Sequence, residues 1–220
     1  STGEKIKYRP FLVKEQKTLM MASESGDETQ IRDSLAGIIS SCTFEKIDPF
    51  NVPMFDVEFL FLRIRGKSVG EKIELNLLCP DDGKTRVKTA LNLEDVNVNM
   101  KAGHTNEISV TDKIKIIMNY PTLNDMVGMA GEKDAGFDEV LSMMKRCVHE
   151  IHDGETVHSK VDMSESDLNE FIESLTTEKF QSLAEFFDTM PKVAHSIDVT
   201  NPKTKKKGEV VIEGIQSFFG

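Results

Sequence analysis

Residues 55–70 decide the fold, and they read FDVEFLFLRIRGKSVG. The apolar positions at the start of this stretch alternate as in a strand, yet Val57, Leu60 and Ile64 also repeat at helical spacing. Pro53 suits a first helical turn, and a run of ten or more residues is long for a strand. The stretch therefore predicts a buried helix, and it contains no catalytic constellation.

The N-terminal stretch at residues 6–15 reads IKYRPFLVKE. It predicts a strand over residues 5–8 and, after Pro10, a first helix that begins near residue 11 or 12. Gly26 suits a left-handed helix end, and Asp27 suits the cap of a second helix. We expect an antiparallel helical hairpin that buries its apolar stripes. The apolar positions of its two helices are Leu12, Leu19 and Met20, and Ile31, Leu35, Ile38 and Ile39.

Two segments together resemble a known family. Residues 8–15 match the pattern Tyr-Arg-Pro-Phe-x-Val-Lys-Glu, and residues 56–70 match Asp-x-Glu-x-Leu-Phe-Leu-Arg-x-Arg-x-Lys-Ser-x-Gly. In this order and spacing, the segments resemble those of the T4-like bacteriophage base plate proteins of the tail hub. The resemblance is strong to about residue 93 and looser through residues 213–219.

The resemblance implies a non-enzymatic base plate hub component, or a factor that promotes hub assembly. The implied partners are other hub or tail proteins. The implied location is the virion tail base plate, the host cytoplasm during assembly, or both. Nothing in the sequence distinguishes a permanent virion part from a transient assembly factor, or predicts the oligomeric state.

From residue 71 the apolar period changes to two, which predicts antiparallel hairpins in the middle of the chain. Helices are expected again later, one of them with a capping box formed by Ser164 and Asp167. The expected hairpins lie at 73–77 with 87–91, 107–110 with 113–118, and 195–200 with 209–213. The expected later helices lie at 123–129, 137–151, 164–175 and 177–190.

These expectations define an α+β fold. It has an N-terminal strand and helical hairpin, central antiparallel β-hairpins, and C-terminal helices closed by a final β-hairpin. Residues 1–70, 71–120 and 121–220 are the expected modules, although all three can belong to one compact domain. The first and last hairpins both turn through a proline, which hints at an internal duplication.

The composition limits the classes of partner. The 220 residues include 37 acidic and 27 basic side chains, for a net charge of −10, so the average surface repels a phosphate backbone. We therefore expect no nucleic-acid partner and a preference for basic protein surfaces. The longest apolar run is far shorter than a membrane span, so we also expect a soluble protein with neither a leader nor a membrane contact.

Three scattered cysteines, Cys42, Cys79 and Cys147, predict free thiols in a reducing compartment. The resemblance implies that hairpins of some relatives carry Cys-x-x-Cys knuckles that bind zinc. The matching turns here begin at Cys79 and Asn201 and read CPDD and NPKT. A structural zinc site usually needs four ligands, so we expect that the metal is lost and the turns are kept.

Candidate partner-binding residues fall into two groups. Arg63, Arg65 and Lys67 are cations at the end of the apolar block, and a second basic patch lies at residues 203–207. Such charges either solubilise the surface or orient an acidic partner. Ile215, Phe218 and Phe219 near the C-terminus either fold into the core or insert into a neighbouring protein.

An enzyme is the main alternative. His149 and His152 lie one turn apart on a predicted helix, with His158 nearby, so a metal-dependent or hydrolytic site is conceivable. The chain has no serine elbow and no phosphate loop, since Phe61 stands where the first glycine of a Walker motif belongs. We therefore expect no catalytic residues, no metal and no cofactor. A nucleic-acid-binding accessory is a weaker third alternative.

Overall fold

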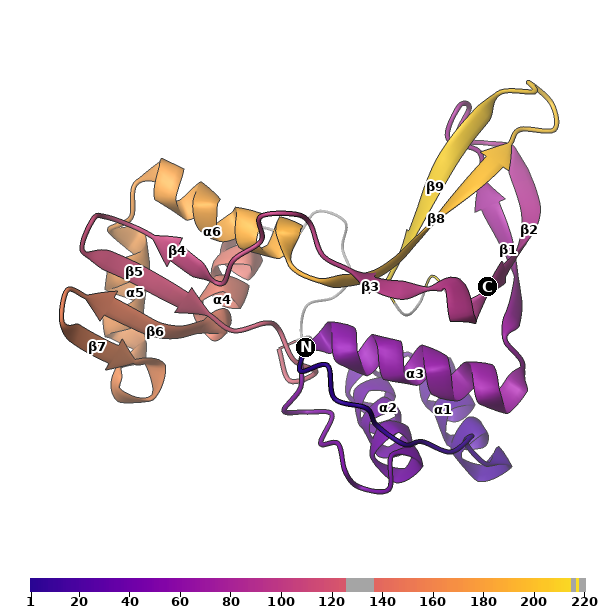
Figure 1. Ribbon diagram of the computed structural model, residues 1–220, viewed down its shortest axis with the longest axis horizontal. Coiled ribbons are helices and arrows are strands. Elements are labelled where there is room, and N and C mark those ends of the chain that lie inside the picture. The colour runs from indigo at the N-terminus through magenta and orange to yellow at the C-terminus, as the bar shows by residue number, and fades with distance from the viewer. Residues whose placement is uncertain (126–136, 215–216, 218–220) are drawn as a thin grey trace. The chain divides into compact units, whose positions relative to one another are not determined.

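The structure is a computed structural model that describes residues 1–125, 137–214 and 217. The chain forms two compact units (Figure 1). Unit 1 comprises Ser1–Asn99 and Pro191–Gly220, and unit 2 comprises Met100–Met190. Both units combine helices with antiparallel strands, so the predicted α+β class is confirmed.

The boundaries of the two units cut across the expected modules 1–70, 71–120 and 121–220. The reason is strand pairing, because the last hairpin of the chain returns to unit 1 and pairs there with a strand near residue 98.

Unit 1 begins with an extended arm followed by three helices. These are α1 (Val13–Ser25), α2 (Glu28–Cys42) and α3 (Met54–Val69). The first two form the predicted hairpin: Gly26 is left-handed, with φ 67°, and the Asp27 carboxylate accepts the backbone N–H groups of Thr29 and Gln30. The choice of helix over strand for α3 is also confirmed, and its fully buried Val57, Phe61 and Ile64 repeat at helical spacing.

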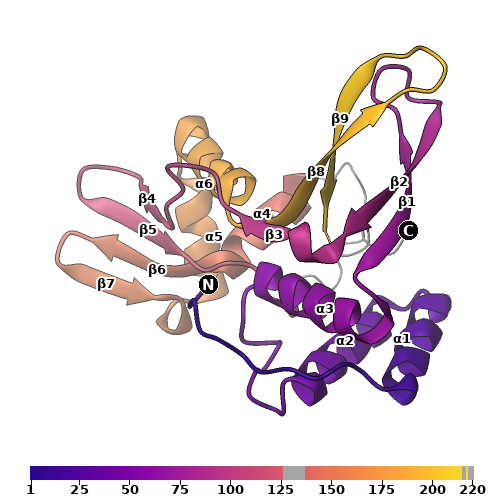
Figure 2. The ribbon, with the colours of Figure 1, turned by 45° about the vertical axis from the view of Figure 1, so that its right-hand side comes forward.

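Two antiparallel ribbons complete unit 1. One sheet pairs β1 (Lys72–Leu78) with β2 (Arg86–Asn92), and a second has the order β3 (Asn97–Asn99), β8 (Lys192–Thr200) and β9 (Lys207–Glu213). A short 3₁₀ helix, η1 (Leu93–Asp95), connects β2 to β3. Figure 2 shows the two hairpins running side by side with their turns at the same end. Both hairpins were predicted.

Unit 2 is a four-stranded antiparallel sheet with three helices packed on one face. The strands are β4 (Glu107–Ser109), β5 (Ile114–Met118), β6 (Val148–Asp153) and β7 (Thr156–Ser159) in that order. The helices are α4 (Phe137–Cys147), α5 (Glu165–Glu173) and α6 (Thr177–Thr189), and a 3₁₀ turn, η2 (Lys160–Asp162), precedes α5. Ile116 and Ile151 of the sheet share one buried cluster with Met144, Leu183 and Phe186 of the helices.

Three predicted elements differ from the structure. Residues 5–8 form no strand, because the arm is held by isolated contacts, such as the bond from the Arg9 N–H to the Cys42 carbonyl, and not by a ladder. The helix expected over 137–151 ends at Cys147, because the residues that follow pair with β5 as β6. Of the helix expected at 123–129, residues 123–125 form a turn and the rest lie outside the described residues.

A paired arginine and glutamate hold the arm against the α1–α2 hairpin. The Arg9 guanidinium donates to both Glu15 carboxylate oxygens, at 3.0 and 2.7 Å, and to the Ser41 hydroxyl at 2.6 Å. The same carboxylate accepts the Leu12 N–H at 2.6 Å. Hydrogen bonds from Arg9, together with those from Leu12 and Ser41, lower the pKa of Glu15 to about 2.

The replacement Glu15→Gln should destabilise the chain, because the neutral amide loses the charge-assisted pair with Arg9. We expect a loss of about 1–3 kcal/mol in the free energy of unfolding near neutral pH, measured by urea denaturation. The depressed pKa makes this contribution fully present above about pH 4.5 and progressively lost as the pH falls toward 2. The difference between the two proteins should therefore shrink over that range. A difference that stays constant from pH 6 to pH 2 would contradict this role for Glu15.

Candidate functional site

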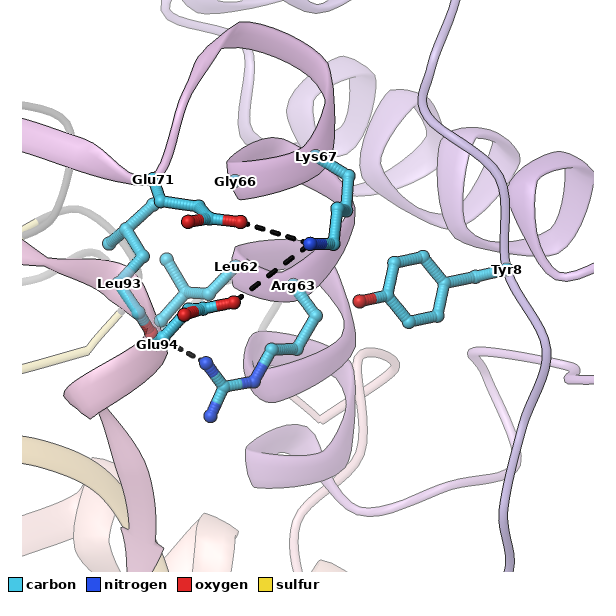
Figure 3. Close-up of a pocket in the computed structure, with 8 residues that line it drawn as sticks. All are labelled: Tyr8, Leu62, Arg63, Gly66, Lys67, Glu71, Leu93 and Glu94. Atoms are coloured by element: carbon cyan, nitrogen blue, oxygen red, sulfur yellow. Dashed lines mark hydrogen bonds and ion pairs between the residues drawn. The ribbon is translucent and has the colours of Figure 1, made fainter.

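The two motif segments that carry the family resemblance meet in unit 1. The Phe11 N–H donates to the Ser68 hydroxyl at 2.9 Å, which joins the first segment to the end of α3. Tyr8 lies beside α3 with its hydroxyl toward Arg63 and Lys67, and the three residues help to line a small hollow (Figure 3). Its volume of about 20 Å³ has room for about one water molecule, so it is too small for a substrate.

Arg63 holds the connection between the sheets of unit 1. Its guanidinium donates to the carbonyl oxygens of Leu93 at 2.7 Å and Val96 at 2.8 Å, and it lies 4.6 Å from the centre of the Phe59 ring. These bonds satisfy carbonyl groups at the two ends of η1. Arg63 is therefore engaged within the chain.

Lys67 and Arg65 differ from Arg63 in their surroundings. The exposed Lys67 ammonium lies 3.0 Å from Glu71 and 3.9 Å from Glu94, and the hydrogen bond to Glu71 raises its pKa (Figure 3). Arg65 is half-buried, and burial lowers its pKa. At 100° per residue, Arg63 and Lys67 share a helix face that Arg65 does not. The three cations therefore do not form one patch, and their role in partner binding stays a prediction.

Ile215, Phe218 and Phe219 lie outside the described residues. Their assignment to a partner surface also stays a prediction.

Helix α1 exposes several apolar side chains. Its buried positions are Glu15 and Ala22, whereas Val13 is 82% exposed, Met20 55% and Met21 59%. These three residues share a face by the i, i+7, i+8 spacing, and the exposed Lys17 and Glu24 lie on the same face. Of the apolar stripe predicted for this helix, Leu12 and Met20 are exposed in this chain and Leu19 is half-buried, because the Arg9–Glu15 pair holds the Glu15 side of α1 inward.

A further apolar side chain lies at the end of the hairpin where α1 begins. Phe44, two residues past α2, is 58% exposed and has a positive φ of 59°, which is unusual for a bulky residue. The bond from Arg9 to Cys42 places this end of α2 beside the start of α1. We define the α1 surface as Leu12, Val13, Met20, Met21 and Phe44.

The second feature joins the two turns that were matched to zinc knuckles. The Asn201 amide donates to Asp81 at 2.8 Å and to Asp82 at 3.0 Å, and the Thr204 hydroxyl donates to Asp81 at 2.5 Å. An added Cβ at Gly208 would approach the Pro80 Cγ to 2.5 Å, so only glycine permits this close packing. We call the two joined turns, together with the first residues of β2 and β9, the paired tip; it comprises residues 79–88 and 201–208.

The residues of the paired tip do not fit a structural zinc ion. The four positions that correspond to knuckle ligands hold one thiol, one carboxylate, one amide and one hydroxyl. The amide oxygen of Asn201 already accepts the backbone N–H groups of Lys203 and Thr204, and Asp82 accepts those of Lys84 and Thr85. Burial and the nearby aspartates raise the pKa of the Cys79 thiol, which disfavours a thiolate. Hydrogen bonds link the turns here.

All three cysteines are free and buried, as expected of small core residues. Burial raises the pKa of the Cys147 thiol to about 12, which makes it a poor nucleophile.

The enzyme alternative placed His149 and His152 on one helix, but α4 ends at Cys147, before both residues. His149 and His152 lie on β6, where residues three apart begin on opposite faces, although both rings approach Glu150, at 3.6 and 2.8 Å. His158 pairs with the buried Ile151, so it lies on the other face from His152. Within the described part of the chain, no three His, Cys, Asp or Glu residues could hold a metal ion.

His104 is a histidine that the sequence did not single out. Its ring nitrogens lie 3.0 Å from the Thr189 and Tyr120 hydroxyls, and burial lowers its pKa. Since Thr189 already donates its hydroxyl to Glu185, it accepts from the His104 Nδ1–H, and the Nε2 accepts from Tyr120. Both ring nitrogens of His104 thus form hydrogen bonds within unit 2.

The main features that sequence reasoning missed are the exposed α1 surface and the joining of the two turns. The signal for the α1 surface was Glu15, which stands on the apolar side of the first helix. The proline turns shared by the two hairpins suggested a duplication but gave no signal of a contact between them.

Replacing Asn201 by alanine should loosen the paired tip, because its side chain joins the two turns and the residue is 1% exposed. We expect a loss of about 1–3 kcal/mol in the free energy of unfolding, measured by urea denaturation. Lys203→Ala, at an exposed position of the same turn, is the matched control and should change stability by less than about 0.5 kcal/mol. Equal effects of the two substitutions would contradict the assignment.

Comparisons with known proteins agree with the resemblance of the two motif segments. Residues 1–220, the whole chain, match the family described as T4 bacteriophage base plate protein. No curated protein and no solved structure matches significantly. In the residues that the structure describes, no helix is both long and apolar enough to cross a membrane. The chain belongs to the T4 bacteriophage base plate protein family.

Proposed function

We propose that this base plate protein is a hub component, or a factor that promotes hub assembly, and that it acts by binding other tail proteins without turning over a substrate. The observation that carries the proposal is the α1 surface. All five of its residues are more than half exposed. Four lie on or beside one short helix, and Phe44 lies at the end where that helix begins. Exposed apolar clusters of this kind are typical of protein–protein contacts.

The chemistry of the α1 surface suits binding. Methionine side chains are flexible and polarisable, so Met20 and Met21 can adapt to a neighbouring surface. An exposed aromatic ring such as that of Phe44 contributes strongly to affinity when a partner covers it. The Arg9–Glu15 pair supports the underside of the helix. The surface is therefore fixed in place before a partner arrives, which lowers the entropy cost of binding.

The state of the polar side chains also favours a binding role. Arg63 and His104 both form side-chain hydrogen bonds within the chain. The proposal covers both a place in the virion tail and a transient role in the host cytoplasm during assembly.

The double variant Met20→Lys with Met21→Lys should weaken association with co-expressed base plate hub proteins at least tenfold. Two ammonium groups would have to be buried in an apolar contact, and even 1.4 kcal/mol corresponds to a factor of about ten in affinity. Size-exclusion chromatography and a binding titration measure the effect. The melting temperature should stay within about 3 °C of the original, since both side chains are exposed.

The control for this variant is Val161→Lys, which adds a cation at a position in unit 2 that is 92% exposed. It should leave the association unchanged. Unimpaired association of the methionine variant would refute the role of the α1 surface, and so would a large drop in its melting temperature.

Mass spectrometry of purified virions separates the two versions of the proposal. A hub component should be present in mature particles at a fixed ratio to the other base plate proteins. An assembly factor should be abundant in infected cells and absent from the particles. A chain that is found in neither particles nor assembly intermediates would contradict both versions.

A further inference from the structure

The paired tip carries a positive charge that the rest of the chain does not. Residues 79–88 and 201–208 contain seven basic side chains and two aspartates, for a local net charge of +5 in a chain of net charge −10. The remaining residues therefore carry −15. The basic residues of the first segment are Lys84, before β2, and Arg86 and Lys88 on β2. Those of the second are Lys203, Lys205 and Lys206 in the turn, and Lys207 at the start of β9.

The structure brings these two basic segments together although they are more than 100 residues apart in the sequence. The hydrogen bonds from Asn201 and Thr204 to Asp81 and Asp82 hold the turns in contact, and Gly208 packs against Pro80. Both hairpins reach the same end of unit 1 (Figure 2). The seven positive charges therefore lie together at one end of unit 1.

The two aspartates of the paired tip are used internally. Hydrogen bonds from Thr204 and Asn201 lower the pKa of Asp81, and those from Thr85 and Lys84 lower the pKa of Asp82. Both carboxylates are therefore ionised, and both accept hydrogen bonds from the second turn. The seven basic residues are all exposed. Across the described residues, none of the seven forms an ion pair within 4.0 Å. Their charge is available to a partner.

We infer that the paired tip is a docking head for an acidic surface on a neighbouring base plate protein. This inference rests on the proposed binding function and names the chemistry of one partner surface. A head of fixed shape and concentrated charge orients the approach of an oppositely charged protein and raises the association rate.

A protein surface fits the paired tip better than a nucleic acid does. A nucleic acid is a long polyanion, and the part of unit 1 outside the tip has 12 basic and 17 acidic side chains, for a net charge of −5. A stretch that extends beyond the tip over unit 1 therefore gains no further attraction. The two segments also contain no aromatic residue on which a base could stack. An acidic patch on a folded protein is short enough to contact the tip alone.

The test uses a fourfold variant in which Lys84, Lys203, Lys206 and Lys207 are replaced by glutamate. Its association rate with the base plate hub proteins, purified without this chain, should fall at least tenfold at 0.15 M salt. The difference from the original chain should shrink at 0.5 M salt, where screening weakens the attraction. The control replaces four exposed lysines elsewhere, Lys5, Lys7, Lys101 and Lys113, by glutamate and makes the same change in net charge. It should bind at a nearly unchanged rate.

A second variant separates the shape of the head from its charge. Gly208→Ala keeps all seven cations but forces Pro80 and the first turn away. Circular dichroism should show a folded chain, and the association rate should fall by a smaller factor than in the fourfold variant. An unchanged rate would overturn the claim that the two turns act together.

Other outcomes distinguish this inference from the proposed function. If the fourfold variant binds as fast as its control, while Met20→Lys with Met21→Lys still weakens the complex, the docking head is refuted and the binding function stands. If the original chain binds no base plate protein, the proposed function itself fails. If the fourfold change abolishes binding to a 30-base-pair DNA duplex and leaves protein association intact, the acidic protein partner is wrong.

Discussion

The pairing of Arg9 with Glu15 is the constraint on which the proposed binding surface depends. The Glu15 carboxylate is 10% exposed and receives hydrogen bonds from Arg9, Leu12 and Ser41, which belong to the arm, the start of α1 and α2. Turning this side of α1 outward would break the hydrogen bonds from Arg9 and Ser41, so these bonds hold it inward. The apolar residues on its other side are then left to face solvent.

Hydrogen bonding fixes the second surface in a similar way. Two turns from distant parts of the sequence are joined by one buried asparagine and two aspartates, and the close approach of Gly208 to Pro80 determines how they pack. Both surfaces thus follow the same plan, in which a polar network inside the unit holds groups that point outward.

Much of the fold could be predicted from the sequence, because helical spacing, alternation and caps are local signals. Asp27 and Ser164 cap the helices that they were expected to cap, and α3 was recognised by its length. The failures were non-local. Val148 and Ile151 fit a helix stripe, but pairing with β5 makes them part of a strand. Met20 fits an apolar helix stripe, but it is 55% exposed, because α1 turns its Glu15 side inward. The contact between the paired turns depends on topology, which no single turn reveals.

The central claim is that this base plate protein works through surfaces that a neighbouring protein covers. Hydrogen–deuterium exchange, measured on the chain alone and on the same chain within assembled base plates, tests it most directly. The account predicts slower exchange in the assembly at residues 13–25, 80–88 and 201–208, with little change in β5, an inner strand of the unit 2 sheet. Unchanged exchange in all three segments, with protection confined to other parts of the chain, would contradict it.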